Sequence, residues 1–284
     1  MEIYRAVDAV AGTCGGSGFF KVSAHGGTPR IVALGDPACA ATRTLPAAAP
    51  AGDRVVFAVP ADRGVRFARL DLVSLRLDTL RTGCVSHRYP AVATTGALAW
   101  ASCAMGDDGI YVWKASDTSA TRVSGPGQVA ARFPSWSPDG ARLVYSVGSG
   151  ARVLATADTT RLSRVLGIAG DTPSWSPDGA WIAYLTGREY PCLGGVGLMR
   201  ADGSDARQVF TNEVTTTYSV GQGPAHEGQT CGPIVWSPDS RALVFPRFFV
   251  GGESLWRLDI ASGKLSKVTA PDQPPRRTSN DSSR

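Results

Sequence analysis

Side chains suited to ligand binding recur directly before three prolines of this sequence. Pro90, Pro134 and Pro173 each follow a pair that joins a charged residue to an aromatic or hydroxyl residue. The pairs, with the histidine that precedes the first, are His87, Arg88 and Tyr89; Arg132 and Phe133; and Asp171 and Thr172. Arginine and aromatic side chains supply much of the contact energy at binding sites, so these pairs predict a site for a partly anionic or aromatic ligand.

Two stretches of extra length add further polar side chains. Residues 186–197 and 211–232 are longer than the matching parts of the chain, and loops of this length in a compact repeat are usually functional or disordered. They contribute Arg188, Glu189, Tyr190, His226 and Glu227. An alternative prediction is therefore a small hydrolase or lyase that pairs a loop histidine with an acidic side chain. The residues available to it are His87, His226, Glu189, Glu227 and Asp171.

Local motifs of catalysis are missing from the sequence. It contains no Gly-x-Ser-x-Gly elbow, no His-Glu-x-x-His, no P-loop and no dinucleotide fingerprint. No Cys-x-x-Cys or Cys/His spacing suits a metal, and Asp107-Asp108 is most simply a turn rather than part of a calcium loop. We therefore predict no catalytic residues, no metal and no cofactor.

A repeated five-residue sequence motif is expected to position the predicted site. Trp136-Ser137-Pro138-Asp139-Gly140 returns at 175–179 and, with serine in place of the final glycine, at 236–240. Ser-Pro-Asp-Gly predicts a tight turn, because proline fixes φ at the second position and glycine accepts positive φ at the fourth. Strand-like runs enter and leave each copy, so each word predicts a hairpin. The aspartates are predicted to serve the turn, and the tryptophans to pack between repeats.

Weaker copies extend this hairpin along the chain. The spacing from Pro134 to Gly140 fits Pro90 to Gly96 and Pro46 to Gly52, which places the turn glycines at steps of 44, 44 and 39 residues. A second hairpin recurs in each unit, beginning near Phe19, Val65, Ile110, Val153, Leu198 and Leu255. Four strands in a period near 44 favour a β-propeller over a β-solenoid, whose repeats are shorter.

The predicted fold is all-β: a single six-bladed β-propeller domain over residues 1–269 with four-stranded antiparallel blades. The blades are expected at about 1–33, 45–80, 89–124, 133–166, 172–210 and 233–269. Blade one has no counterpart of the innermost strand, which suggests a trimmed start. The tail 270–284 is rich in proline, serine and arginine and is predicted to be disordered.

The three Trp-Ser-Pro-Asp words resemble the WD40-like PD40 repeat of TolB-type β-propellers. The resemblance covers about residues 1–270 as a repeat pattern. The second hairpin occurs six times, which agrees with the six blades typical of this family. It implies a periplasmic or other extracytoplasmic binding protein. The same repeat also occurs in propellers attached to serine peptidases and in polysaccharide lyases, so the resemblance is not specific for one function.

The cysteines fall at one face of such a propeller. If the Ser-Pro-Asp turns lie on one face, all six cysteines lie in loops on the other, and spatial neighbours predict the disulfides Cys14–Cys39, Cys84–Cys103 and Cys192–Cys231. Disulfides indicate an oxidising compartment. The alternative is free, partly buried thiols in a cytosolic protein. The predicted binding residues and both insertions belong to the same face as the cysteines.

Composition narrows the partners. Basic residues exceed acidic ones by 29 − 24 = 5, but they are spread along the chain without a cluster, which argues against nucleic acid. No apolar stretch reaches 18 residues, so no membrane span is predicted. The chain is expected to be a monomeric, non-catalytic extracytoplasmic propeller that binds a protein or glycan on its disulfide-bearing face. A further alternative is the sensor fragment of a larger membrane protein.

Overall fold

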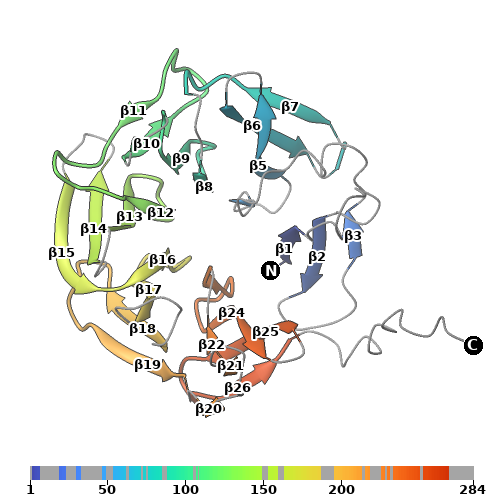
Figure 1. The fold of residues 1–284 in the computed structure, drawn as a ribbon, viewed down its shortest axis with the longest axis vertical. Helices are drawn as coiled ribbons and strands as arrows, with labels where there is room; N and C mark the ends of the chain where they lie inside the picture. Colours follow the sequence, from blue (N-terminus) through green and yellow to red (C-terminus); the bar gives the residue numbers. More distant parts are fainter. Residues whose placement is uncertain are drawn as a thin grey trace, which may run out of the picture.

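The described part of the chain is built from β-strands arranged around a common centre (Figure 1). The computed structural model describes residues 2–6, 19–23, 30–32, 47–48, 54–61, 64–71, 73–74, 76–84, 88–104, 107, 109–148, 153–158, 163–186, 195–212, 215–217, 225–227, 229–230, 233–249 and 252–268. Among these residues there is no helix that is long and apolar enough to cross a membrane.

The first three sheets follow one another along the chain, and each is antiparallel. The first has the order β1-β2-β3 and comprises β1 (Glu2–Ala6), β2 (Phe19–Ser23) and β3 (Arg30–Val32). The second is β4-β5-β6-β7, with β4 (Ala47–Ala48), β5 (Arg54–Ala61), β6 (Gly64–Asp71) and β7 (Leu77–Leu80). The third joins β8 (Arg88–Val92), β9 (Leu98–Ala101), β10 (Ile110–Trp113) and β11 (Thr121–Arg122).

The remaining sheets repeat the same sequential order. The fourth comprises β12 (Arg132–Trp136), β13 (Arg142–Val147), β14 (Val153–Asp158) and β15 (Ser163–Ala169). The fifth comprises β16 (Asp171–Trp175), β17 (Trp181–Thr186), β18 (Gly195–Arg200) and β19 (Arg207–Thr211). In the last, β22 (Gln229–Thr230) and β23 (Val235–Trp236) both pair with β24 (Ala242–Phe249), followed by β25 (Gly252–Asp259) and β26 (Leu265–Lys267). This is the propeller-like arrangement of antiparallel sheets that the repeat predicted.

An additional hairpin lies within the stretch predicted as a long insertion. The strands β20 (Thr215–Thr217) and β21 (Ala225–Glu227) pair antiparallel, with Thr216 opposite His226. Because neither strand matches the repeated pattern, the sequence analysis predicted only extra length here. The insertion therefore carries secondary structure of its own.

The Ser-Pro-Asp turns form as predicted, and all three close in the same way. The amide of the fourth residue donates to the carbonyl of the serine in each, at 2.8 Å from Gly140 to Ser137 and 3.0 Å from Gly179 to Ser176. Ser240, which replaces the glycine in the third copy, adopts the same left-handed conformation at φ 57°. The fourth position thus demands positive φ whichever residue occupies it.

The serine and aspartate side chains hold each turn closed from inside. The Ser137 hydroxyl donates to the Asp139 carboxylate and accepts the Arg142 amide at 2.9 Å, and the same Asp139 oxygen accepts the Ala141 amide at 3.0 Å. The other two copies repeat these bonds, with Ser176 and Asp178 in one and Ser237 and Asp239 in the other. The recurring aspartates are structural, as predicted.

Neighbouring turns also touch one another, which places them together on one face. The Thr94 hydroxyl donates to the Pro138 carbonyl at 3.0 Å, and the Ser240 hydroxyl accepts the Asp178 amide at 3.1 Å. A side chain at Gly179 would lie 3.7 Å from Pro138, so the turns at 137–140 and 176–179 are in contact as well. We call this surface, formed by residues 94–96, 137–140, 176–179 and 237–240, the turn face.

The core lies between adjacent sheets. One buried cluster joins Ala99 and Ile110 of the third sheet to Trp136 and Tyr145 of the fourth. Others join Val144 to Trp175, and Leu198 to Trp236. Trp136 and Trp236 also donate their indole N–H to the inner strand of the preceding sheet, at Ala91 and Ser174, whereas Trp175 donates to Gly179 in its own turn. The three tryptophans pack between sheets as predicted.

We predict that the turns make the fold sensitive to acid. Hydrogen bonds from Ser137 and Ser237, together with backbone amides, hold the pKa values of Asp139 and Asp239 below the ordinary value. The folded state therefore favours the ionised carboxylates. Their stabilising contribution is present above about pH 4 and is lost as the pH falls through the lowered pKa values.

Replacing both residues, Asp139→Asn and Asp239→Asn, should lower the melting temperature at pH 7 by a few degrees. The difference from the wild type should shrink as the pH falls from about 4 to 2, because the wild type then loses the same charge. Thermal unfolding followed by circular dichroism at each pH measures it. A difference that stays constant across this range would contradict the stated role of the carboxylates.

Candidate functional site

The predicted binding pairs lie at the beginning of three neighbouring inner strands. Arg88 and Tyr89 open β8, Arg132 and Phe133 open β12, and Asp171 and Thr172 open β16. These strands lie nearest the centre of the ring, and β12 contacts both β8 and β16 (Figure 1). Because the Ser-Pro-Asp turns follow the other ends of β12 and β16, the pairs lie on the opposite surface, which we call the loop face.

A bulge at the same place in each strand sets the direction of these side chains. Between Arg88 and Ala91 the strand holds one residue more than its partner β9, and β12 and β16 repeat the irregularity. In all three bulges the residue directly before the proline is in the left-handed region, with φ 52° at Tyr89, 55° at Phe133 and 44° at Thr172. Such a conformation costs about 1–3 kcal/mol for a non-glycine residue, and bulges redirect side chains near functional sites.

The bulges bring two aromatic rings together at the junction of β8 and β12. The ring centroids of Tyr89 and Phe133 are 4.1 Å apart, and the ring planes meet at 45°. Both residues are half-buried, and Tyr89 packs against the core cluster between the third and fourth sheets. The two residues therefore lie where β8 and β12 begin, at the loop face, and each remains partly accessible to solvent.

Each ring follows an arginine. Arg88 is exposed, and Arg132 is half-buried, with its Nε donating to the Ala130 carbonyl at 3.2 Å. Neither guanidinium forms an ion pair with a carboxylate in the described part of the chain. The site thus presents two positive charges on adjacent strands beside an aromatic pair.

The third strand carries the opposite charge. The Asp171 carboxylate accepts the Ser146 hydroxyl at 2.7 Å, which links β16 to β13 of the preceding sheet. Ser146 is fully buried and also lies within hydrogen-bonding distance of the Arg132 carbonyl, at 3.3 Å. Ser146 was not predicted from the sequence, although a serine within the apolar strand Leu-Val-Tyr-Ser-Val was a signal for such a role.

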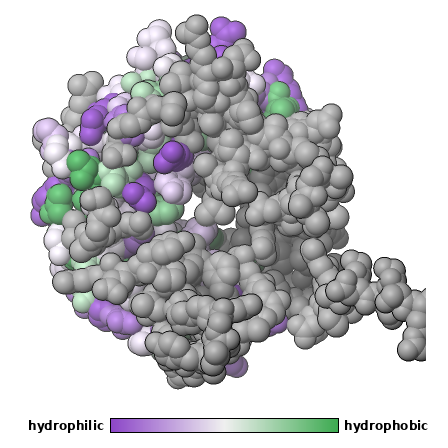
Figure 2. Space-filling model, in the orientation of Figure 1, coloured by the Kyte–Doolittle hydropathy of each residue, from purple (hydrophilic) through white to green (hydrophobic). Residues whose placement is uncertain are grey.

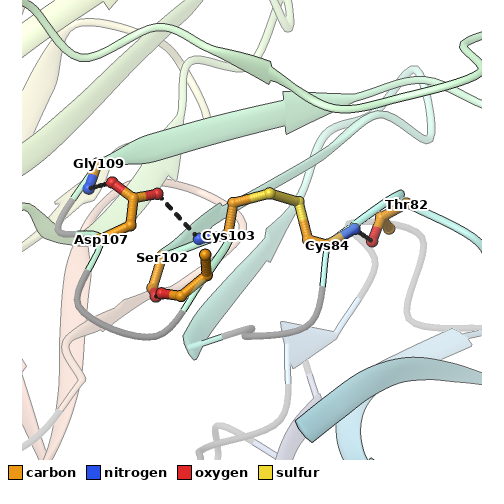
Figure 3. Close-up of a disulfide and its surroundings, with 7 residues drawn as sticks. Thr82, Cys84, Ser102, Cys103, Asp107 and Gly109 are labelled. Atoms are coloured by element: carbon orange, nitrogen blue, oxygen red, sulfur yellow. Dashed lines mark hydrogen bonds between the residues drawn. A yellow bond between two sulfur atoms is a disulfide. The ribbon is translucent and has the colours of Figure 1, made fainter. Parts of the chain in front are cut away.

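A disulfide fixes the loop beside this site. Cys84 and Cys103 are bonded with their Cα atoms 4.7 Å apart, which is the pairing predicted from the positions of the two loops (Figure 3). Cys103 follows β9, whose last residue Ala101 pairs with Arg88. The disulfide therefore lies at the loop face and ties the segment that leads into β8 to the third sheet.

Asp107 organises the loop on the Cys103 side. Its carboxylate accepts the amides of Cys103 and Gly109, each at 3.2 Å (Figure 3). It also lies 3.8 Å from Arg122. Burial by itself would raise the pKa of Asp107, but a hydrogen bond from Tyr111, the two amides and Arg122 lower it further than burial raises it. Burial and the hydrogen bond to Asp107 raise the pKa of Tyr111 to about 12. Asp107 is thus an ionised structural residue of the loop.

Figure 2 shows the molecule in the orientation of Figure 1, hollowed near its middle, with hydrophilic and hydrophobic described side chains intermixed over the part of the ring that holds β8 to β19. Within the described part of the chain, His, Cys, Asp and Glu side chains form no group of three that could hold a metal ion.

The other predicted residues are not brought to this site by the described structure. His87, Arg188, Glu189 and Tyr190 lie outside the described residues, as do Cys14, Cys39, Cys192 and Cys231. His226 and Glu227 belong to β21, opposite Thr216 and Thr215, and only their backbone is described. Their part in a ligand site, and the two other disulfides, remain predictions.

Comparison with known proteins supports the fold. Neither a known family model nor a curated protein sequence matches this chain. TolB from Acinetobacter baumannii is similar in structure, with a TM-score of 0.68 and 13% identity over 95% of this chain and 67% of that one. A nidogen/laminin complex gives 0.64 with 12% identity over 95% and 93%, and an oligogalacturonate lyase in complex with manganese gives 0.56 with 15% identity over 86% and 74%. The fold is therefore a β-propeller of the TolB kind.

We predict that removal of the disulfide destabilises the protein. The bond closes a loop of 19 residues, for which the chain-entropy relation gives about 3 kcal/mol. The double variant Cys84→Ser/Cys103→Ser should lower the free energy of unfolding by about this amount in a urea titration under oxidising conditions. An unchanged denaturation midpoint would show that the bond does not constrain the unfolded chain.

Proposed function

We propose that this chain is a non-catalytic, extracytoplasmic propeller that binds a protein partner on its loop face. The observation that carries the proposal is the repeated bulge in β8, β12 and β16. It holds non-glycine residues in the left-handed region at one level of three neighbouring strands. Backbone strain of this kind tends to persist where it serves a site. Here it accompanies two arginines and two aromatic rings, the residue types enriched in protein interfaces.

The disulfide and the repeat support the extracytoplasmic compartment in this proposal. Cys84–Cys103 is a bond that persists in oxidising surroundings, and the Trp-Ser-Pro-Asp words resemble those of TolB-type propellers. The structural likeness to TolB and to a propeller seen in a nidogen/laminin complex supports a protein rather than a glycan as the partner. A glycan on the same face is the finer alternative that the sequence also allows.

Photo-crosslinking tests the binding face. A photoreactive amino acid replaces Arg88, Arg132 or, as the matched control, Arg241, an exposed arginine that follows the third turn on the turn face. After irradiation with an envelope extract of the producing cells, positions 88 and 132 should give one shared adduct that position 241 does not give. Mass spectrometry identifies it. Adducts at position 241 alone, or equal adducts at all three, would refute a loop-face site.

The lyase neighbour gives a reason to test catalysis directly. If the fold served a lyase or hydrolase here, the loop histidines would supply the general base or a metal ligand. We expect no turnover of oligogalacturonate, or of a glycan and lactone panel, with or without manganese. Turnover that disappears in His87→Ala or His226→Ala would replace binding by catalysis as the function. The control is His25→Ala, which changes the third histidine of the sequence, outside the two long insertions and the pairs before the prolines, and should leave such turnover intact.

A further inference from the structure

The junction of β8 and β12 has the features of a subsite for one chemical group. The short distance between Tyr89 and Phe133, 4.1 Å between ring centroids, shows that the two strand openings are adjacent. Each ring is preceded by an arginine in the same strand, so the two arginines begin neighbouring strands directly beside the ring pair. Two strands, rather than one loop, therefore supply a positively charged site for an anion beside an apolar surface.

The charge of this area is not balanced by the described protein. Elsewhere in the described part of the chain, arginines commonly meet carboxylates: Arg69 lies 3.3 Å from Asp78, and Arg122 lies 3.8 Å from Asp107. Arg88 and Arg132 have no such pair among the described residues. Two like charges on neighbouring strands repel each other, and an anion placed between them removes that cost. A carboxylate is the matching group, because it can accept two parallel N–H bonds from a guanidinium.

Resting on the proposed function, we infer that this junction takes an acidic peptide segment. A Glu or Asp carboxylate of the segment binds Arg88 and Arg132, and the neighbouring apolar side chain contacts Tyr89 and Phe133. The rings meet at 45° and are half-buried, so together they do not form one flat platform for a sugar ring. A tilted pair of rings suits an aliphatic or aromatic side chain.

The next strand limits where the acidic group can lie. β16 repeats the bulge but carries Asp171 in the place of the arginine, with its carboxylate held by Ser146. β16 therefore brings no arginine to this level. The acidic residue of the segment belongs over β8 and β12, where the arginines lie.

Fluorescence anisotropy with defined peptides tests this assignment. The probe is a labelled decapeptide with Glu-Phe at its centre in a Gly/Ser background; matched peptides carry Gln-Phe or Glu-Ser. The Glu-Phe peptide should bind at least about tenfold more tightly than either. The Gln-Phe peptide loses one charge-assisted contact and the Glu-Ser peptide loses the burial of one aromatic side chain, and each loss is worth about this factor. Its affinity should fall as salt rises, because the contact is partly exposed.

Variants locate the binding. Arg88→Ala or Arg132→Ala should remove the preference for Glu over Gln, Arg88→Lys should retain part of it, and Arg241→Ala on the turn face should leave it unchanged. Equal binding of the Glu and Gln peptides, no binding of any peptide, or equal loss in Arg241→Ala would overturn the inference. Melting temperatures within a few degrees of the wild type show that each variant is folded.

A carboxylated glycan separates this inference from the proposed function. If oligogalacturonate binds and depends on Arg88 and Arg132 while the peptides do not bind, the ligand class is wrong but the loop face remains a binding face. If the crosslinking adducts described above also fail to form at positions 88 and 132, the proposed function fails as well. The two experiments therefore give different answers for the site and for its ligand.

Discussion

One buried hydroxyl in each turn governs the geometry of this protein. Ser137, Ser176 and Ser237 are almost fully buried, and each donates to the aspartate two residues ahead while accepting the amide five residues ahead. A buried hydroxyl that kept neither bond would cost about 1–3 kcal/mol, so the turn is closed strictly. Because the closed turns touch one another, their shape fixes how adjacent sheets meet at the centre.

The same constraint determines the opposite face. Arg132 and Ser137 are separated by the length of β12, which corresponds to about 15 Å of extended chain. With the turn anchored at one end, the bulge at the other end holds its residues at a fixed height. β16 repeats this arrangement before Ser176, whereas β8 ends in a turn without the serine hydroxyl, closed by the bond from the Gly96 amide to the Ala93 carbonyl at 2.9 Å. Side chains 39 to 44 residues apart in the sequence thus begin three strands at one level. The disulfide adds a second anchor beside the first of these strands.

The sequence predicted the elements that depend on local chemistry. The Ser-Pro-Asp motifs predicted hairpins, because a proline and a residue with positive φ within four positions define a tight turn. Cys84 and Cys103 could be paired once the loops had been assigned to faces. The left-handed state of Tyr89, Phe133 and Thr172 was not predicted, because a residue before proline is ordinarily extended. That state arises from the register between two strands. The hairpin β20–β21 and the bond from Ser146 to Asp171 likewise depend on pairings between distant segments.

In the bulge of the inner strands, the path of the backbone does not depend on which two residues precede the proline. The proline and the paired residues before and after the bulge determine the path of the backbone. The two residues before the proline, in contrast, are Arg-Tyr, Arg-Phe and Asp-Thr in successive sheets. One frame therefore already tolerates three different pairs within a single molecule. Substitutions at these positions can therefore change which ligand is bound, one sheet at a time, without changing the strands and turns that hold them.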